Sequence, residues 1–303
     1  MGREAYVTLV ATPDYLVGAL VLSKCLRHTG TSRPLLAMVG DLLSESDIEE
    51  LREAHYHIVR VPPVITAPSD AESARPLINS TLLKLHLFGL NSHLPNSHLP
   101  KSHFPKSHLE RLVYLDADVL LLRPLDHLFS LSLSPHAPFA AAPEIMPPDR
   151  FNSGVMVVHP SDGVYEALLA YAAQSASKTD QEILNGFFND WFTLPSPHRL
   201  SFDYNVIQTV SSYYEPAWNV VRGRQGEREM KVLHFAGGRS VKPWSFAGTL
   251  SHSLAVYLYL WQSIARAEEG SDLTPLFQVL SLTDAAEINR LFNSKDTSHG
   301  ATT

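Results

Sequence analysis

Two aspartates one residue apart, Asp116 and Asp118, are the residues of this chain best suited to chemistry. They interrupt an apolar run, 111–122, that is rich in Leu and Val and typical of a buried strand in an α/β sheet. Two ionised carboxylates are costly in an apolar setting unless something pairs with them. A divalent cation is the simplest partner for two oxygen ligands at this spacing. The sequence therefore predicts a metal site in an enzyme that handles phosphates.

A second group of candidates follows another short apolar run, at the segment 234–244. His234 is a candidate third metal ligand, because imidazole commonly binds divalent metals. Gly237 and its neighbouring glycine let the backbone approach an anion closely, and Lys242 can place a positive charge on a phosphate oxygen. A core histidine and a surface lysine are the alternative. The presence of the aspartate pair in the same chain favours the functional interpretation.

Two further pairs contain residues that suit a sugar. Asn152 and Ser153 precede a predicted strand and offer neutral donors for hydroxyl groups, although a simple turn is the alternative. Asp180 and Gln181 open a predicted helix, where the helix dipole by itself favours a carboxylate. The functional interpretation places Asp180 beside the reacting sugar carbon.

Two cations, Arg75 and Lys84, flank a stretch that precedes the aspartate motif in the chain. Together they could clamp a nucleotide or its diphosphate, since cationic side chains form strong hydrogen bonds to phosphate. Solvated surface charges are the alternative for both.

Two classes of enzyme place an Asp-x-Asp pair after a buried strand. Phosphatases of the haloacid-dehalogenase type carry it near the N-terminus, with Thr or Val two residues after the second aspartate. Sugar-nucleotide glycosyltransferases use the pair to hold a metal on the donor diphosphate. Here the motif lies in the middle of the chain and Leu120 occupies the Thr position. This layout favours the transferase.

Alternating strands and helices are predicted to position these residues. The opening βαβαβ pattern is typical of the first half of a nucleotide-binding sheet, which binds ligands at the carboxyl ends of its strands. Ser46 and Glu49 predict a capping box at the start of the second helix. The expected strands are 6–11, 35–39, 57–61, 111–122, 154–159 and 232–235, and the expected helices are 18–28, 46–54, 81–90, 163–176, 179–191 and 251–269.

A pentad repeat occupies residues 91–110, with histidine in each unit at His93, His98, His103 and His108. Proline in every fifth position argues against a helix, so a low-complexity loop is expected rather than a metal site. We expect a single catalytic domain over residues 1–270 that carries this loop. Residues 271–303 are expected to form a C-terminal helix and a loose tail.

Composition argues against several classes of function and location. The chain has 303 residues, 45% of them hydrophobic, and a formal net charge of -7, which argues against nucleic-acid binding. Its one cysteine, Cys25, excludes an internal disulfide and is expected to pack on a helix face. We find no signal peptide and no apolar run of about 18 residues, so no membrane association is expected. The expected location is the cytoplasm or the nucleus.

Several segments together resemble glycogenin and its relatives, the retaining glycosyltransferases of family 8. The likeness runs from about residue 5 to residue 246. It rests on the segments 6–9, 18–22, 81–86, 115–118, 151–155, 180–181, 234–235 and 242–244.

The resemblance implies a fold of the glycosyltransferase-A type, an α/β domain whose Rossmann-like nucleotide-binding sheet is flanked by helices. It implies that Asp116, Asp118 and His234 bind Mn²⁺, and that Asp180, Gln181 and Lys242 are catalytic. It also implies a homodimer. The implied contacts to the UDP-sugar are Leu9, Thr12, Tyr15, Arg75, Lys84, Ala117, Asn152, Ser153, Gly237 and Lys242.

The chain departs from glycogenin in ways that concern the acceptor. Ser177 stands where glycogenin has a second aspartate, and Ser212 falls at the place of its acceptor tyrosine, next to Tyr213 and Tyr214. These departures favour transfer of galactose or glucose, in α-linkage, to an external acceptor. The family includes a cytoplasmic α-galactosyltransferase of protists that caps a glucose-terminated glycan on the adaptor of SCF ubiquitin ligases, and this chain resembles it in size. The alternatives are a self-glucosylating primer of glycogen synthesis that uses UDP-glucose and a scaffold without activity.

Overall fold

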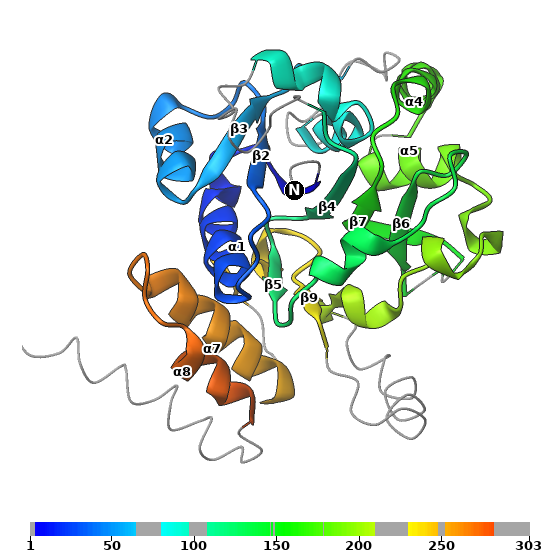
Figure 1. Cartoon of the computed structure of the whole chain (residues 1–303). Coiled ribbons are helices and arrows are strands. Elements are labelled where there is room, and N and C mark those ends of the chain that lie inside the picture. Colours follow the sequence, from blue (N-terminus) through cyan, green and yellow to red (C-terminus); the bar gives the residue numbers. More distant parts are fainter. Residues whose placement is uncertain are drawn as a thin grey trace, which may run out of the picture.

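The fold is built on a six-stranded sheet in the order β3-β2-β1-β4-β7-β6 (Figure 1). The computed structural model describes residues 4–64, 80–96, 108–145, 147, 149–177, 179–209, 230–247 and 252–281. The first four strands of the sheet pair in parallel, whereas β7 runs antiparallel to β4 and to β6. The strands are β1 (Glu4–Val10), β2 (Leu35–Val39), β3 (Tyr56–Arg60), β4 (Arg111–Leu115), β6 (Phe139–Pro143) and β7 (Phe151–Val158). The predicted α/β class and its βαβαβ opening are confirmed.

A second, three-stranded sheet lies beside the first and has the order β5-β9-β8. Its strands are β5 (Val119–Leu121), β8 (Val206–Ile207) and β9 (Val232–His234). The apolar run 111–122, predicted as one strand, therefore splits between two sheets. The chain turns at residues 116–118, where it leaves β4 and enters β5. The aspartate motif is this turn, so it stands at the junction of the two sheets.

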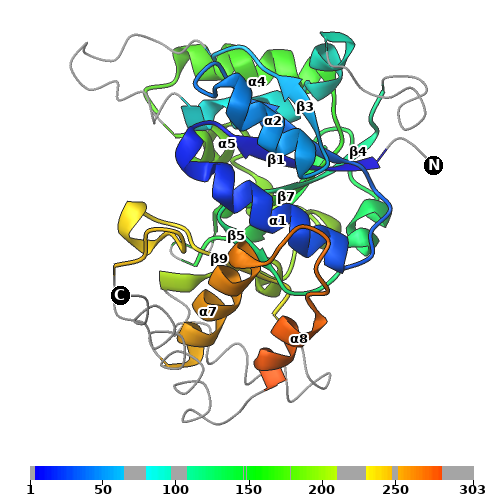
Figure 2. The ribbon, with the colours of Figure 1, turned by 90° about the vertical axis from the view of Figure 1, so that its left-hand side faces the viewer.

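Helices cover both faces of the main sheet, because its strands alternate apolar side chains toward two separate cores. On one face Tyr6 and Val10 pack with α1 (Leu16–His28), α2 (Glu45–Glu53) and the small sheet. The same core takes in α7 (His252–Arg266), which lies against α1 (Figure 2). Val7 and Leu9 face the opposite core, which is covered by the 3₁₀ helix η2 (Leu82–Leu87), α4 (Asp162–Gln174) and α5 (Asp180–Phe187).

Short helices connect these elements. They are η1 (Pro13–Tyr15), η3 (Leu90–Asn96), η4 (Asp126–Ser130), η5 (Trp191–Thr193), η6 (Ser196–His198), η7 (Phe202–Tyr204), η9 (Arg239–Val241), α8 (Thr274–Phe277) and η10 (Gln278–Ser281). Within the described residues, no helix is both long and apolar enough to cross a membrane.

The capping-box prediction was also wrong, and the loop prediction for the repeat fails at its first residues. The capping box is formed by Ser44 and Asp47, and the Asp47 side chain accepts the Ser44 backbone N–H at 2.8 Å. The helix α2 therefore begins at Glu45, before the predicted cap Ser46. The repeat begins with a 3₁₀ helix rather than a loop, because the residues before its first proline keep their backbone N–H groups and Ser92 donates to Gly89. Residues 97–107 lie outside the described part of the chain. Cys25 is fully buried in the core, as expected.

Candidate functional site

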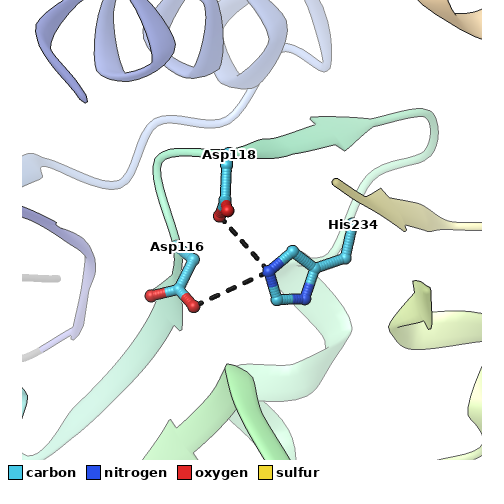
Figure 3. A group of neighbouring side chains, drawn as sticks. All are labelled: Asp116, Asp118 and His234. Atoms are coloured by element: carbon cyan, nitrogen blue, oxygen red, sulfur yellow. Dashed lines mark ion pairs between the residues drawn. The ribbon is translucent and has the colours of Figure 1, made fainter. Parts of the chain in front are cut away.

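Strand pairing brings Asp116, Asp118 and His234 together (Figure 3). Antiparallel β5 and β9 place His234 opposite Val119, and the Phe235 backbone N–H donates to the Asp118 carbonyl at 3.0 Å. His234 Nε2 then lies 3.2 Å from Asp118 Oδ1 and 3.8 Å from Asp116 Oδ2. One ligand atom from each of the three residues lies within 4.8 Å of the others. The cluster is compatible with a divalent metal.

Positive groups keep the buried Asp118 carboxylate ionised, as a metal ligand must be. Asp118 is buried, and burial alone would raise the pKa of its carboxyl group, but His234 and then Lys242 outweigh burial and hold this pKa well below its usual range. Lys242 donates to Asp118 and, at 3.1 Å, to the Phe235 carbonyl. Burial lowers the pKa of Lys242, yet Asp118, Tyr15 and Asp116 together outweigh burial and the net shift is upward. Both groups therefore stay ionised in the interior.

Lys84 joins Asp116 to Asp180. Its Nζ lies 3.0 Å from Asp116 Oδ1 and 2.8 Å from Asp180 Oδ2, and it also donates to the Ser153 hydroxyl at 3.2 Å. Burial alone would lower the pKa of Lys84, but the two carboxylates together raise it. Tyr114, the last but one residue of β4, donates its hydroxyl to Asp116. With Lys242 the site holds two buried ammonium groups against three carboxylates, so a divalent cation would offset the excess negative charge.

Amide side chains line the other side of the site. Asn152 and Ser153 lie inside β7 and not in a turn before it, because β7 begins at Phe151 and runs antiparallel to β4. This direction sets the start of β7 beside the end of β4, where Gly154 accepts the Asp116 backbone N–H at 2.9 Å. Gln181, in the first turn of α5, accepts the Ser153 backbone N–H at 3.2 Å.

Glu144 and Asn205 belong to the same network, although neither was among the predicted site residues. Glu144 Oε2 accepts from Asn152 Nδ2 at 2.9 Å and from Gln181 Nε2 at 3.1 Å. Asn205, which is fully buried, contacts Asn152 Oδ1 at 2.8 Å and His234 Nδ1 at 2.9 Å. Nothing in the local sequence around either residue assigns it a role, and the tertiary pairing of the strands brings both to the site.

Two glycines allow the close approaches that the site needs. A Cβ atom on Gly18, in α1, would lie 2.3 Å from the Ala117 carbonyl oxygen, so only glycine lets the helix pack against the aspartate turn. A Cβ atom on Gly154 would lie 2.3 Å from Cε1 of His234. Each glycine therefore fixes the place of one half of the metal cluster.

The predicted site residues line a cavity of about 230 Å³. Of the predicted site residues, only Arg75 is not among its lining, and Arg75 lies outside the described residues. Those that line it are Leu9, Thr12, Tyr15, Lys84, Asp116, Ala117, Asp118, Asn152, Ser153, Asp180, Gln181, His234, Gly237 and Lys242. A larger hollow of about 810 Å³, lined by Arg33 and Arg60 among others, contains none of them, and these two arginines are paired with Glu4 and Glu45. The smaller cavity therefore contains the candidate metal-binding and catalytic residues.

The chain matches the family described as Glycosyl transferase family 8 over residues 6–248. Glycogenin-1 of Caenorhabditis elegans is 34% identical over 270 residues, covering 87% of this chain and 56% of that protein. Glycogenin of Neurospora crassa is 33% identical over 264 residues, covering 84% of this chain and 33% of its relative. The chain thus spans little more than half of the first protein and a third of the second.

A solved structure of the galactosyltransferase LgtC, in complex with donor and acceptor sugar analogs, has the same fold. The TM-score is 0.56 at 16% identity, and the likeness covers 88% of this chain and 97% of that one. At this identity the comparison concerns the fold alone, and it confirms the predicted glycosyltransferase-A type.

Proposed function

The chain belongs to glycosyl transferase family 8, and on this premise we propose that it is a retaining hexosyltransferase that uses a UDP-hexose and Mn²⁺. The observation that carries the proposal is the cluster of Asp116, Asp118 and His234 in the lining of a cavity that Asp180 also lines. The metal ligands would bind the diphosphate of the donor through the metal, and the carboxylate would face its sugar.

Asp116, Asp118 and His234 would hold the metal on the donor diphosphate. Two carboxylates and an imidazole suit Mn²⁺, which accepts oxygen and nitrogen ligands. When bound, the metal supplies positive charge that stabilises the leaving diphosphate. Lys242, beside Asp118, and Lys84, beside Asp116, add fixed positive charges aimed at the same group, and such preorganised charges stabilise the transition state.

The nucleotide would lie toward Thr12 and Tyr15, which line the cavity beyond the aspartates. The Thr12 hydroxyl is buried and has no hydrogen-bond partner among the described residues, which suits a polar atom of the nucleotide. The ring of Tyr15 packs edge-on to Trp244, with 5.3 Å between ring centroids, so its orientation is fixed before a ligand binds.

The sugar would lie between Asp180, Gln181 and Asn152. Asp180 Oδ2 accepts from the Ser153 hydroxyl at 2.8 Å and from Lys84, so the carboxylate is held in place as an anion. An anion here steadies the positive charge that develops on the anomeric carbon while its bond to the diphosphate breaks. Galactose and glucose differ at one hydroxyl, which Asn152 and Gln181 are suited to recognise through directed hydrogen bonds.

For the acceptor we propose an external glucose-terminated glycan, such as one on a cytoplasmic glycoprotein like the SCF ubiquitin ligase adaptor. Ser212 at the place of the glycogenin acceptor tyrosine supports this choice, and that position lies outside the described residues. The alternative, self-glucosylation with UDP-glucose, is supported by the names of the relatives, which are glycogenins. A homodimer is part of the proposal and rests on the family resemblance.

A donor panel tests the proposal. Purified protein with Mn²⁺ is offered UDP-galactose, UDP-glucose and other UDP-sugars, UDP release is measured, and transfer to α- and β-glucosides is then scored. We expect release with UDP-galactose or UDP-glucose and transfer that forms an α-linkage. Intact mass after incubation with each donor separates the alternatives, because added hexoses on the protein itself would favour the self-glucosylating primer. No release with any UDP-sugar would reject the proposed function.

A further inference from the structure

We propose that Asn205 is a positioning residue that fixes His234 in the tautomer with its proton on Nδ1, which leaves Nε2 free to bind the metal. The inference rests on the proposed function, since it concerns the metal that the transferase would use. It follows from which group donates and which accepts in a series of buried hydrogen bonds that links Gly154 to His234 through Asn152 and Asn205.

The series of hydrogen bonds starts at a group that can only be a donor. The backbone N–H of Gly154 can only donate, and it lies 2.9 Å from one side-chain atom of Asn152. That atom must therefore be the amide oxygen of Asn152, and the other must be its NH₂ group. The other side-chain atom of Asn152 supports this assignment, because it contacts the Glu144 carboxylate, which accepts and therefore requires the NH₂ group there.

The next link fixes Asn205. One of its side-chain atoms lies 2.8 Å from the Asn152 oxygen, which cannot donate, so this atom must be the Asn205 NH₂ group. The Asn205 oxygen then faces His234 Nδ1 at 2.9 Å. Because an amide oxygen only accepts, Nδ1 must carry a proton. Asn205 is fully buried, so solvent does not compete for either bond.

The last link concerns the other nitrogen of the ring. Nε2 of His234 points at Asp118 Oδ1 and Asp116 Oδ2, 3.2 and 3.8 Å away. In the neutral ring with its proton on Nδ1, Nε2 presents a lone pair to two carboxylates, which is the donor set of a metal site. Partners that orient a histidine ligand in this way commonly change metal affinity when they are mutated.

Asn205 also reaches the sugar side of the cavity. Its NH₂ group holds the oxygen of Asn152, whose own NH₂ group meets Glu144 beside Gln181. The residue thus performs two separable tasks: it accepts from His234 and it donates to Asn152. Two substitutions distinguish them, because aspartate keeps an acceptor but loses the donor, whereas leucine loses both at a similar size.

The experiment measures Mn²⁺ affinity by electron paramagnetic resonance in the full-length wild type, N205D and N205L. We expect N205L to bind Mn²⁺ about 10- to 100-fold more weakly. N205D should keep the wild-type affinity, yet raise KM for the UDP-hexose, because Asn152 loses its donor. N91L is the matched control: Asn91 makes two hydrogen bonds to the Leu109 backbone outside the cavity, so its loss should leave Mn²⁺ affinity unchanged.

Equal Mn²⁺ affinity in N205L and the wild type would overturn the inference, and so would an equal loss in N205D and N205L. A second measurement needs no change at residue 205 and so does not depend on how the variants fold. In ¹⁵N-histidine-labelled, metal-free protein, the His234 signals are assigned by comparison with H234Q. A proton on Nδ1 supports the inference, and a ring protonated on Nε2 alone overturns it. A wild type that binds no Mn²⁺ would reject the proposed function, while the tautomer would still decide this inference.

Discussion

Nζ of Lys84 lies 2.8 Å from Oδ2 of Asp180, and both side chains are buried. Because the same ammonium group also meets Asp116, one cation joins a proposed metal ligand to the proposed sugar carboxylate. K84M would leave two carboxylates in the interior without their partner. We expect it to lower the free energy of unfolding by about 3–5 kcal/mol, measured by urea denaturation.

The matched control for this prediction is the double variant K84M/D180N, which removes one of the two stranded charges and should recover part of the loss. If K84M is as stable as the wild type, the ion pair does not hold the two halves of the site together in solution.

Gly154 is required by the position of His234. Its replacement by alanine would put a Cβ atom 2.3 Å from His234 Cε1 and 2.6 Å from Nδ1, so the ring must leave its present position beside the aspartates. G154A should weaken Mn²⁺ binding by about tenfold or more, as other changes that displace a ligand's support do. G163A is the control, because no atom lies within 4 Å of the added Cβ in α4. Equal Mn²⁺ affinity in the two variants would show that the ring is not constrained by β7.

Glu144 holds the two amide side chains that we propose for sugar recognition. Its Oε2 accepts from both Asn152 and Gln181, and hydrogen bonds to a charged group contribute about 1.5–3 kcal/mol. E144A should therefore raise KM for the UDP-hexose about tenfold or more, while Mn²⁺ affinity stays the same because Gly154 still fixes Asn152. The exposed Glu166 on α4 offers the control variant E166A, which should leave both quantities unchanged. An unchanged KM in E144A would remove Glu144 from the donor site.

His86 makes the stability of the fold sensitive to mild acid. Burial lowers the pKa of its imidazole from 6.5 to about 4, with a smaller lowering by His93 and an opposing hydrogen bond to the Pro62 carbonyl. The folded state favours the neutral ring, so the stability it contributes is complete above pH 6.5 and falls as the pH drops toward 4.

The variant H86Q has no charge to gain over this range. Between pH 6.5 and 4 the wild type should lose up to about 3 kcal/mol more in free energy of unfolding than H86Q does. Parallel stability curves for the two proteins would contradict the role given to burial.

Much of the fold was predictable because it follows from local patterns. The parallel βαβαβ half alternates apolar strands with amphipathic helices, and the carboxyl end of β4 carries Asp116 as expected. Where two local patterns overlapped, the sequence could not rank them. Ser44 with Asp47 and Ser46 with Glu49 have the same capping spacing, and only the structure shows that the first pair caps α2.

The rest depends on pairing between distant segments. Asn152 and Ser153 are weak strand formers, yet β7 includes them because the strand is paired on either side of them in the sequence: β6 pairs with Phe151, and β4 and β6 pair with residues after Gly154. Asn205 follows the short helix η7, and it contacts His234 because β8 and β9 pair in parallel. Such residues support the site through tertiary contacts that no local spacing reveals.

The central claim is that Asp118, with Asp116 and His234, holds a metal that a UDP-hexose needs in order to react. The most direct test is UDP release from the preferred donor by the wild type and by D118A, each with Mn²⁺ and again after chelation with EDTA. Circular dichroism should first show that D118A is folded. The account predicts release by the wild type only with Mn²⁺ and no release by D118A under either condition. Full activity of D118A, or of the chelated wild type, would contradict it.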